Sequence, residues 1–343
     1  MNASSSASNE TATNDFDLEY QIGRLIFSYV LFVPTIIGIL FNPLVVYIYS
    51  QKTFEMISAT FYLKVLAIAD LTINIQSLIP IAIITLDAQL VSRASTICKL
   101  VYFFSYLNGA ICSWLEVCVS LDRCLSVTWL GMSTRLNNRT LKRTVLIALL
   151  LYNLALYSLV LHYYDSMGGV SCRSASATFA EVIGWYDMVS AMLLPFFIML
   201  CCSILTIRSL VKHRQAIELT TVQSSNGASV KTSNHHLSIN RSQQMSIRQQ
   251  QQQKSKRERE FQFSLISISM NVLFLLLLVP ICVYFIYSSY VYMNPSSSFL
   301  FHSLTILIGS FNYSFKFFIF YFINTKFRSE LYKIRLFNWF LRE

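Results

Sequence analysis

The sequence predicts an all-α membrane protein, a bundle of seven transmembrane helices followed by a short amphipathic helix. Of its 343 residues, 54% are hydrophobic and only 13% are charged, whereas a soluble domain carries about 25% charged residues. Seven apolar segments each reach the roughly 20 residues that a helix needs to cross a bilayer. The alternation typical of barrel strands is absent, so we expect helices, which satisfy their own backbone groups in lipid. The segments are 25–50, 59–86, 98–121, 143–163, 188–211, 261–289 and 298–323.

The first 22 residues are rich in Ser, Thr and Asn and are predicted to form a disordered tail, because they carry too little apolar surface to fold alone. They show neither the basic region nor the apolar core of a cleavable signal peptide. Asn2 and Asn9 each begin an Asn-x-Ser/Thr sequence. Both are candidate glycosylation sites if this tail is extracellular.

Charged residues predict the orientation in the membrane. The loops after the first, third and fifth segments, the adjoining helix ends and the chain after 325 hold 22 basic and 7 acidic residues, whereas the opposite side holds 4 and 8. By the positive-inside rule we expect a multi-pass plasma-membrane protein with an extracellular N-terminus and a cytoplasmic C-terminus. The basic surplus then faces anionic lipid, so membrane lipid is an expected partner and nucleic acid is not.

Two of the eight cysteines, Cys98 and Cys172, fall in predicted extracellular segments, where a disulfide bond persists. We therefore expect these two to pair, and we interpret the other six as small packing residues. Cys98 begins the third segment, and Asp122-Arg123 ends it about 37 Å away, at a rise of about 1.5 Å per residue. The third segment thus runs from an extracellular disulfide to an ionised pair at the inner surface.

Two polar regions interrupt or follow the membrane domain, which we place at 23–325. The loop at about 212–256 contains His235-His236 and a run of glutamines, and we predict a disordered cytoplasmic tether. The histidine pair has no cysteine or carboxylate cluster beside it, so neither a metal nor a cofactor is expected. Residues 326–343 are predicted to form an amphipathic helix on the inner leaflet and a short tail. The apolar face of this helix comprises Phe327, Leu331, Ile334 and Phe337.

Several short motifs occur in order along these segments. They are Gly38-Ile-Leu-Phe-Asn42, Leu66-Ala-Ile-Ala-Asp70-Leu71, Cys98 with Asp122-Arg123-Cys124, Pro195 and Pro280. Their order and spacing resemble those of the rhodopsin-like G-protein-coupled receptors, over roughly residues 25–338. The resemblance implies a receptor that transduces an extracellular ligand to a heterotrimeric G protein. An enzyme is not expected, because no His, Cys and carboxylate residues occur at catalytic spacing.

The same resemblance implies a role for Arg123. In the resting receptor, Asp122 and an acidic residue of the sixth helix, here Glu260, would hold Arg123 in ion pairs. Outward movement of the sixth helix would then free Arg123 for the G protein, with Leu130 or Met132 as an apolar contact in the second inner loop. An arginine at this depth could also simply extend its head group to the surface.

The seventh segment departs from the family pattern. Where the family has Asn-Pro-x-x-Tyr, this chain has the five residues from Lys316 to Phe320, and Leu278 replaces the tryptophan of the sixth helix. Lys316 could bind retinal, extend to the inner surface, or pair with acids inside the membrane. The retinal-binding lysine of opsins corresponds to Ser310, about 9 Å away along a helix. Because buried charges are usually paired, we favour the third alternative.

Asp70 and Glu116 are the expected partners of that lysine. Glu116 lies seven residues before Arg123 and therefore on the same inward face of the third helix. The resemblance implies a sodium-binding pocket beside Asp70, and we expect the Lys316 ammonium to take the place of sodium. The predicted intramembrane polar cluster comprises Asn42, Asp70, Glu116, Asn312 and Lys316.

The expected ligand is a basic neuropeptide. Ser105 occupies the position where amine receptors carry aspartate, which argues against a biogenic amine. The acidic extracellular side favours a basic ligand, and the altered motif in the seventh segment resembles that of invertebrate neuropeptide receptors. Two alternatives stay open: a divergent or decoy receptor that does not couple, and a channel or transporter. The candidate pocket residues are Gln76, Tyr102, Ser105, Tyr106, Asp187, Phe285 and His302.

Overall fold

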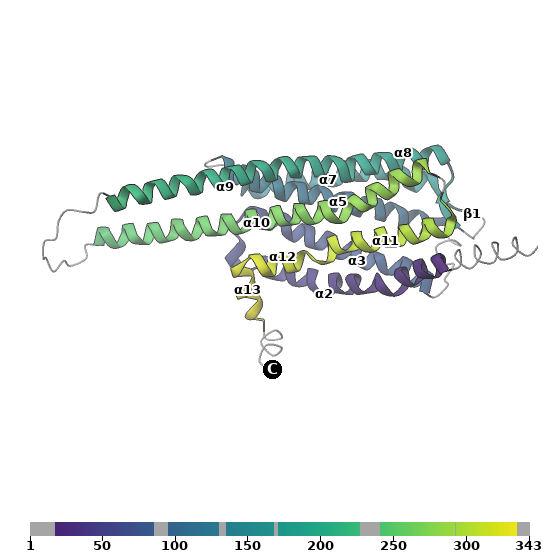
Figure 1. Cartoon of the computed structure of the whole chain (residues 1–343), viewed down its shortest axis with the longest axis horizontal. Coiled ribbons are helices and arrows are strands. Elements are labelled where there is room, and N and C mark those ends of the chain that lie inside the picture. The colour runs from purple at the N-terminus through teal and green to yellow at the C-terminus, as the bar shows by residue number, and fades with distance from the viewer. Residues whose placement is uncertain are drawn as a thin grey trace, which may run out of the picture.

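The computed structural model describes residues 18–85, 95–129, 135–167, 171–226, 241–291 and 293–334, and it shows a bundle of long helices lying side by side (Figure 1). Within these residues, six helical segments are long and apolar enough to cross a membrane. Together with α5 (Ser95–Thr128), they form the predicted bundle of seven. The six are Leu18–Tyr49, Ala59–Ala82, Arg139–Tyr163, Ala177–Lys212, Glu258–Ser288 and Pro295–Ile323.

Helix α5 is the central helix of the bundle. It is 34 residues long, which corresponds to about 51 Å. Because protein surrounds α5, it can bury polar side chains, and Glu116, Asp122 and Arg123 are each at most 3% exposed. Both ionic clusters described below are built on this helix. Its neighbours include α3 (Ala59–Thr85), α7 (Arg139–Tyr163), α9 (Leu194–Asn226) and α10 (Arg241–Tyr290).

The last three spans also depart from regular α-helix or carry a proline. Residues Met188–Leu193, just before Pro195 of α9, form a π-helical turn, since a proline lacks the N–H and displaces the turn before it. α10 contains Pro280. The last span breaks at Phe315 into α11 (Pro295–Ser314) and α12 (Lys316–Ile323). This break, which has no proline, makes Lys316 the first residue of α12.

A β-hairpin covers one end of the bundle (Figure 1). Strand β1 (Tyr164–Met167) pairs antiparallel with β2 (Ser171–Ser174), and α8 (Ala177–Asp187) follows. The Nζ atom of Lys99, near the start of α5, lies 3.9 Å from the Oδ2 atom of Asp165 in β1. The hairpin therefore lies beside the start of α5, and we refer to this end of the bundle as the hairpin end.

Cys98 at the start of α5 is disulfide-bonded, and six other cysteines in the described residues are free. The remaining cysteine, Cys172, lies on β2, where its backbone is opposite Ser166. The hairpin thus brings the strand of Cys172 close to Cys98. The predicted pairing of these two fits this placement and stays a prediction.

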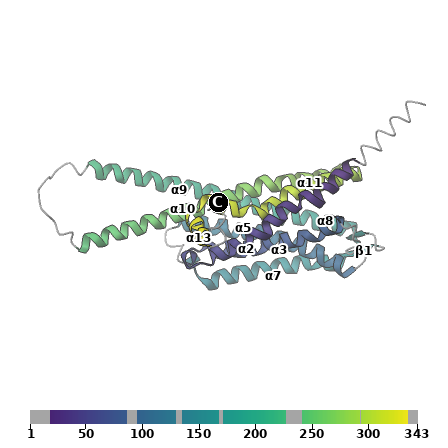
Figure 2. The ribbon, with the colours of Figure 1, turned by 90° about the horizontal axis from the view of Figure 1, so that it is seen from below.

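Helical structure extends further than the sequence predicted. The tail predicted to be disordered is helical from Leu18. Within the loop predicted to be disordered, α9 continues to Asn226 and α10 already begins at Arg241. The prediction is wrong there, because Gln, Lys, Arg and Glu favour helix even in a segment of polar composition. Both helices extend past the others at the end opposite the hairpin (Figures 1 and 2). Asn2, Asn9 and Phe337 lie outside the described residues.

The amphipathic helix after the last span is α13 (Thr325–Tyr332). Asn324 caps it, with Oδ1 accepting bonds from two backbone N–H groups of the first turn at 3.1 and 3.2 Å. Phe327 and Leu331 are fully buried, and the Phe327 ring lies 5.3 Å from that of Tyr49. The predicted contact with lipid is wrong for these two residues, because an amphipathic pattern does not distinguish an apolar protein surface from lipid.

Candidate functional site

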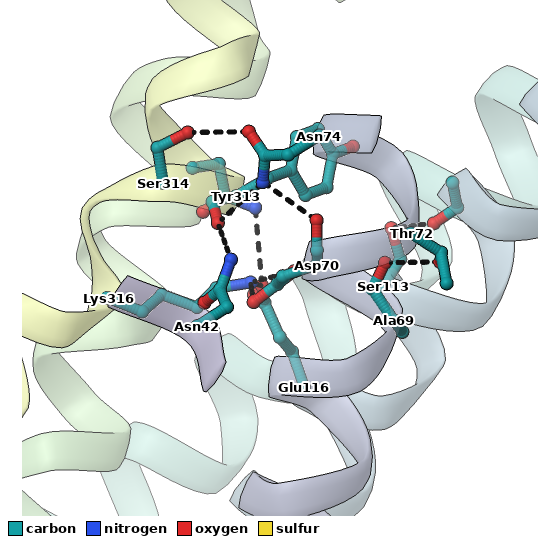
Figure 3. Close-up of polar contacts among 12 residues, drawn as sticks. Asn42, Ala69, Asp70, Thr72, Asn74, Ser113, Glu116, Tyr313, Ser314 and Lys316 are labelled. Carbon is teal, nitrogen blue, oxygen red and sulfur yellow. Dashed lines mark hydrogen bonds and ion pairs between the residues drawn. The ribbon is translucent and has the colours of Figure 1, made fainter. Parts of the chain in front are cut away.

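A buried ionic cluster lies in the middle of the bundle, where α3, α5 and α12 meet (Figure 3). The Lys316 Nζ atom lies 2.9 and 3.0 Å from the two carboxylate oxygens of Asp70 and 2.7 Å from Glu116 Oε1. Each of the three side chains is at most 2% exposed. The structure thus brings together the three charged residues that the sequence placed at one depth, and we call this group the Lys316 cluster.

Two asparagines stabilise the helix break that positions Lys316. Tyr313 is among the last residues of α11, where carbonyl groups lack partners within the helix. Its carbonyl accepts hydrogen bonds from Asn42 Nδ2 at 3.1 Å and from Asn74 Nδ2 at 3.3 Å. Ser314 Oγ donates to Asn74 Oδ1 at 2.9 Å. Asn42 therefore acts on the backbone beside the charges, and Asn74 is a contributor that the sequence analysis missed.

Close approach of α2 (Phe32–Tyr49) to α3 holds the Asn74 amide in this position. A Cβ atom added at Gly38 would lie 2.3 Å from the Asn74 side chain, much closer than two carbon atoms can pack. The glycine in the first-helix motif is thus required by its packing against the second transmembrane helix.

The Lys316 cluster holds two carboxyl groups and one ammonium group. Asn312 Nδ2 donates to Glu116 Oε1 at 3.2 Å. Within the described residues, the other Glu116 oxygen and Asn312 Oδ1 have no hydrogen-bond partner, which is unfavourable for buried acceptors. Asp70, with both oxygens bonded to Lys316, is therefore the better satisfied of the two acids.

A second ionic cluster lies near the end of α5 that is opposite the hairpin. Arg123 Nη2 lies 2.6 Å from Asp122 Oδ2, and Nη1 lies 2.6 Å from Glu260 Oε2 on α10. Ser58, just before α3, donates to Asp122 Oδ1 at 2.5 Å. The Arg123 side chain is 2% exposed, whereas that of Glu260 is 27% exposed. The Arg123–Glu260 pair thus links α5 to α10 at a partly solvated position, and we call this group the Arg123 cluster.

A chain of hydrogen bonds joins α5, α9 and α10 between these two clusters. Ser120 Oγ donates to Asn271 Oδ1 at 2.9 Å, and Asn271 Nδ2 donates to Ser203 Oγ at 2.7 Å. None of these residues was among the candidates predicted from the sequence. The available signal was an asparagine inside the apolar part of α10, because a buried amide requires partners.

Some of the candidate ligand residues lie in separate places toward the hairpin end. Gln76 Nε2 donates to Ser105 Oγ at 2.6 Å and joins α3 to α5. The Phe285 ring of α10 lies 5.6 Å from that of Trp185 on α8, while His302 of α11 packs beside a tyrosine of α10. The structure does not gather these residues into one contact group.

Asp187, at the end of α8, is joined through Tyr157 to a group of tyrosines. Tyr157 of α7 donates from its hydroxyl to Asp187 Oδ1 at 2.7 Å. The Tyr106 ring stacks on Tyr157 with centroids 5.8 Å apart, and Tyr102 stacks on Tyr164 at 4.5 Å. No motif marks Tyr157 or Tyr164, and the sequence analysis missed both. We call these five residues the tyrosine–aspartate cluster.

Two predicted contact residues, Leu130 and Met132, lie outside the described residues. In the part of the chain that is described, no group of three or more His, Cys, Asp and Glu side chains is placed to hold a metal ion.

Comparisons with known proteins connect these clusters to a family. A sequence model of the family described as 7 transmembrane receptor (rhodopsin family) matches residues 41–316, a range that includes the residues of both ionic clusters. The chain is also similar to human C-C chemokine receptor type 6, with 25% identity over 210 residues, or 54% of each chain. It therefore aligns with about half the length of this curated relative.

Proposed function

The chain belongs to the rhodopsin family of seven-transmembrane receptors, and from this membership we propose that it transmits a ligand signal to a heterotrimeric G protein through movement of α10 around Arg123. The Arg123–Glu260 ion pair carries the proposal, because it joins α5 to α10 at the end away from the hairpin. Such a contact allows two packings, one with the pair and one without it. A ligand that binds the second packing better by a few kcal/mol shifts the population toward it.

The contacts of Arg123 suit this role. Asp122 and Arg123 are neighbours on α5, and Ser58 orients the aspartate, so this pair can persist when α10 moves. Glu260 lies on the moving helix and is partly solvated, so breaking its pair costs less than separating two fully buried charges. Movement of α10 would leave one side of the guanidinium available to carbonyl or carboxylate groups of the G protein.

We place the Arg123 end in the cytoplasm and the hairpin end outside the cell, in the plasma membrane. The distribution of basic residues supports this orientation through the positive-inside rule. The G protein would then meet α13, the extensions of α9 and α10, and the loop that holds Leu130 and Met132.

We propose a basic peptide of the neuropeptide type as the ligand. The extracellular side in this orientation carries eight acidic and four basic residues, which favours the approach of a cationic partner. The human relative is named as a receptor for C-C chemokines.

The Lys316 cluster has a proposed role in setting the resting state. Its ammonium lies where the family resemblance implies sodium, and it supplies the positive charge that Asp70 and Glu116 require. We therefore expect signalling to be insensitive to replacement of sodium by a bulky organic cation. A sodium effect that disappears in Asp70→Asn would contradict this role.

Nucleotide exchange tests the proposed function. The wild type and the Glu260→Ala variant, each as the full chain in lipid nanodiscs, are mixed with each class of purified heterotrimeric G protein, and nucleotide exchange by the G protein is measured. Glu260→Ala should raise the exchange that occurs without ligand. We expect exchange with at least one class, its loss in Arg123→Ala, and its persistence in Arg139→Ala, an exposed arginine control. Failure with every class would favour the non-coupling receptor, and ionic current in cells without G proteins would favour the channel.

A further inference from the structure

Asp187 differs from the other acidic side chains inside the bundle. Asp70, Glu116 and Asp122 each contact a lysine or an arginine. Among the residues that the structure describes, no Lys, Arg or His lies within ion-pair distance of Asp187. Its hydrogen-bond donor is the neutral hydroxyl of Tyr157, at 2.7 Å.

We propose that Asp187 and the tyrosines around it bind a cationic group of the ligand, an alkylammonium or a guanidinium. The inference rests on the proposed function, since it names the chemistry that the receptor recognises. A carboxylate packed among helices with one neutral partner is energetically unfavourable. A cation delivered by the ligand supplies the charge that the protein itself does not place there.

The tyrosine–aspartate cluster has the aromatic surfaces that such a cation requires. Cations bind the faces of aromatic rings within about 6 Å, and Tyr157, which donates to the carboxylate, stacks on Tyr106. Tyr106 and Tyr157 have ring centroids 5.8 Å apart, and the hydroxyl of Tyr106 lies 3.2 Å from that of Tyr164. Because the tyrosines come from α5, α7 and β1, the site forms only when these three elements pack together.

The position of the cluster agrees with ligand entry. Tyr164 belongs to the hairpin, so the cluster lies at the end that the proposed orientation places outside the cell. Asp187 is only partly buried, unlike Asp70. The acidic excess of the extracellular segments would also raise the local concentration of a cation.

Two matched probes test the proposal on the full chain in nanodiscs. N-acetyl-arginine amide carries a guanidinium, and N-acetyl-citrulline amide has nearly the same shape without the charge. Each is titrated while the midpoint of thermal unfolding is measured, since a ligand that binds the folded state raises it. We expect the arginine probe to act at concentrations at least about tenfold lower than the citrulline probe, and Asp187→Asn to remove this preference.

Control variants separate a specific site from general attraction to an acidic surface. Glu181→Gln removes an exposed carboxylate from the same helix and should keep the preference. If Asp187→Asn does not fold, Tyr106→Leu serves instead, and it should weaken the arginine probe several-fold but not the citrulline probe. Propylguanidine, a single guanidinium without a peptide backbone, distinguishes the sources: potency equal to that of the arginine probe indicates a small cationic ligand, and weaker potency indicates a peptide.

Equal responses of the wild type to the arginine and citrulline probes would overturn the proposal, as would a preference that survives Asp187→Asn. The assay contains no G protein, so its outcome is independent of coupling. A receptor that binds the cation without nucleotide exchange would refute the proposed function alone, and the reverse result would refute this inference alone.

Discussion

Replacing Lys316 by methionine removes the ammonium of the Lys316 cluster and keeps an unbranched side chain. In the wild type this ammonium lies within 3.0 Å of both Asp70 oxygens and 2.7 Å from Glu116. Removing one partner of a buried ion pair costs about 3–5 kcal/mol, because the remaining charge stays inside the protein without a counterion. Lys316→Met leaves two such carboxylates. We therefore expect a loss in this range, seen as a fall of roughly 10 °C in the unfolding midpoint.

The assay is thermal unfolding of the purified chain in nanodiscs, followed by tryptophan fluorescence. The matched control is the triple variant Lys316→Met, Asp70→Asn, Glu116→Gln, which keeps the side-chain sizes and contains no charge at the cluster. Since uncharged replacements for buried ion pairs are well tolerated, the control should regain most of the lost stability. If Lys316→Met alone unfolds at the wild-type temperature, the lysine does not neutralise these two acids and the reasoning is refuted.

Four further variants test individual contacts. Glu116→Gln should lower the free energy of unfolding by less than about 1 kcal/mol, and Asp70→Asn should lower it by clearly more. The reason is that both Asp70 oxygens but only one Glu116 oxygen contact the ammonium. Equal unfolding midpoints of the two variants would contradict this. Gly38→Ala should lower the free energy of unfolding by about 1–3 kcal/mol, because the added Cβ would lie 2.3 Å from the Asn74 amide. An unfolding midpoint equal to that of the wild type would show that the two helices can separate freely. Asn324→Ala should lower the free energy of unfolding by about 1 kcal/mol and speed amide hydrogen exchange in α13, because Asn324 caps the first turn of that helix. Unchanged exchange would argue against the cap.

The charged residues of the Lys316 cluster could be recognised from the amino-acid sequence because charges are rare inside membrane spans and must find partners. Asp70 and Lys316 lie at matching depths of their helices, and Glu116 is two turns from Arg123 on one face of α5. The pairing of Arg123 with Glu260 was implied by the resemblance to the rhodopsin-like receptors. The resemblance also implied that position 316 lies beside Asp70, whereas helical periodicity alone places Glu116 and Arg123 on one face.

Other contacts depend on features that have no such periodic pattern. The role of Asn74 follows from the break at Phe315, where no proline announces the interruption of the helix. Tyr157 meets Asp187 through the packing of α7 against α8, and a tyrosine in an apolar helix carries no sign of its partner. Phe327 shows the same limit, because apolar spacing identifies a buried face but not the surface that covers it.

Ligand-independent nucleotide exchange by Glu260→Ala tests the central claim most directly, that an ion pair between α5 and α10 holds the receptor at rest. The control is Glu258→Ala, an exposed acid on the same helix. If the Arg123–Glu260 pair at 2.6 Å contributes about 1 kcal/mol or more to the resting state, its loss raises the active population at least several-fold. We expect this increase in Glu260→Ala and no increase in Glu258→Ala. Basal exchange that is the same in both variants and the wild type would contradict the account.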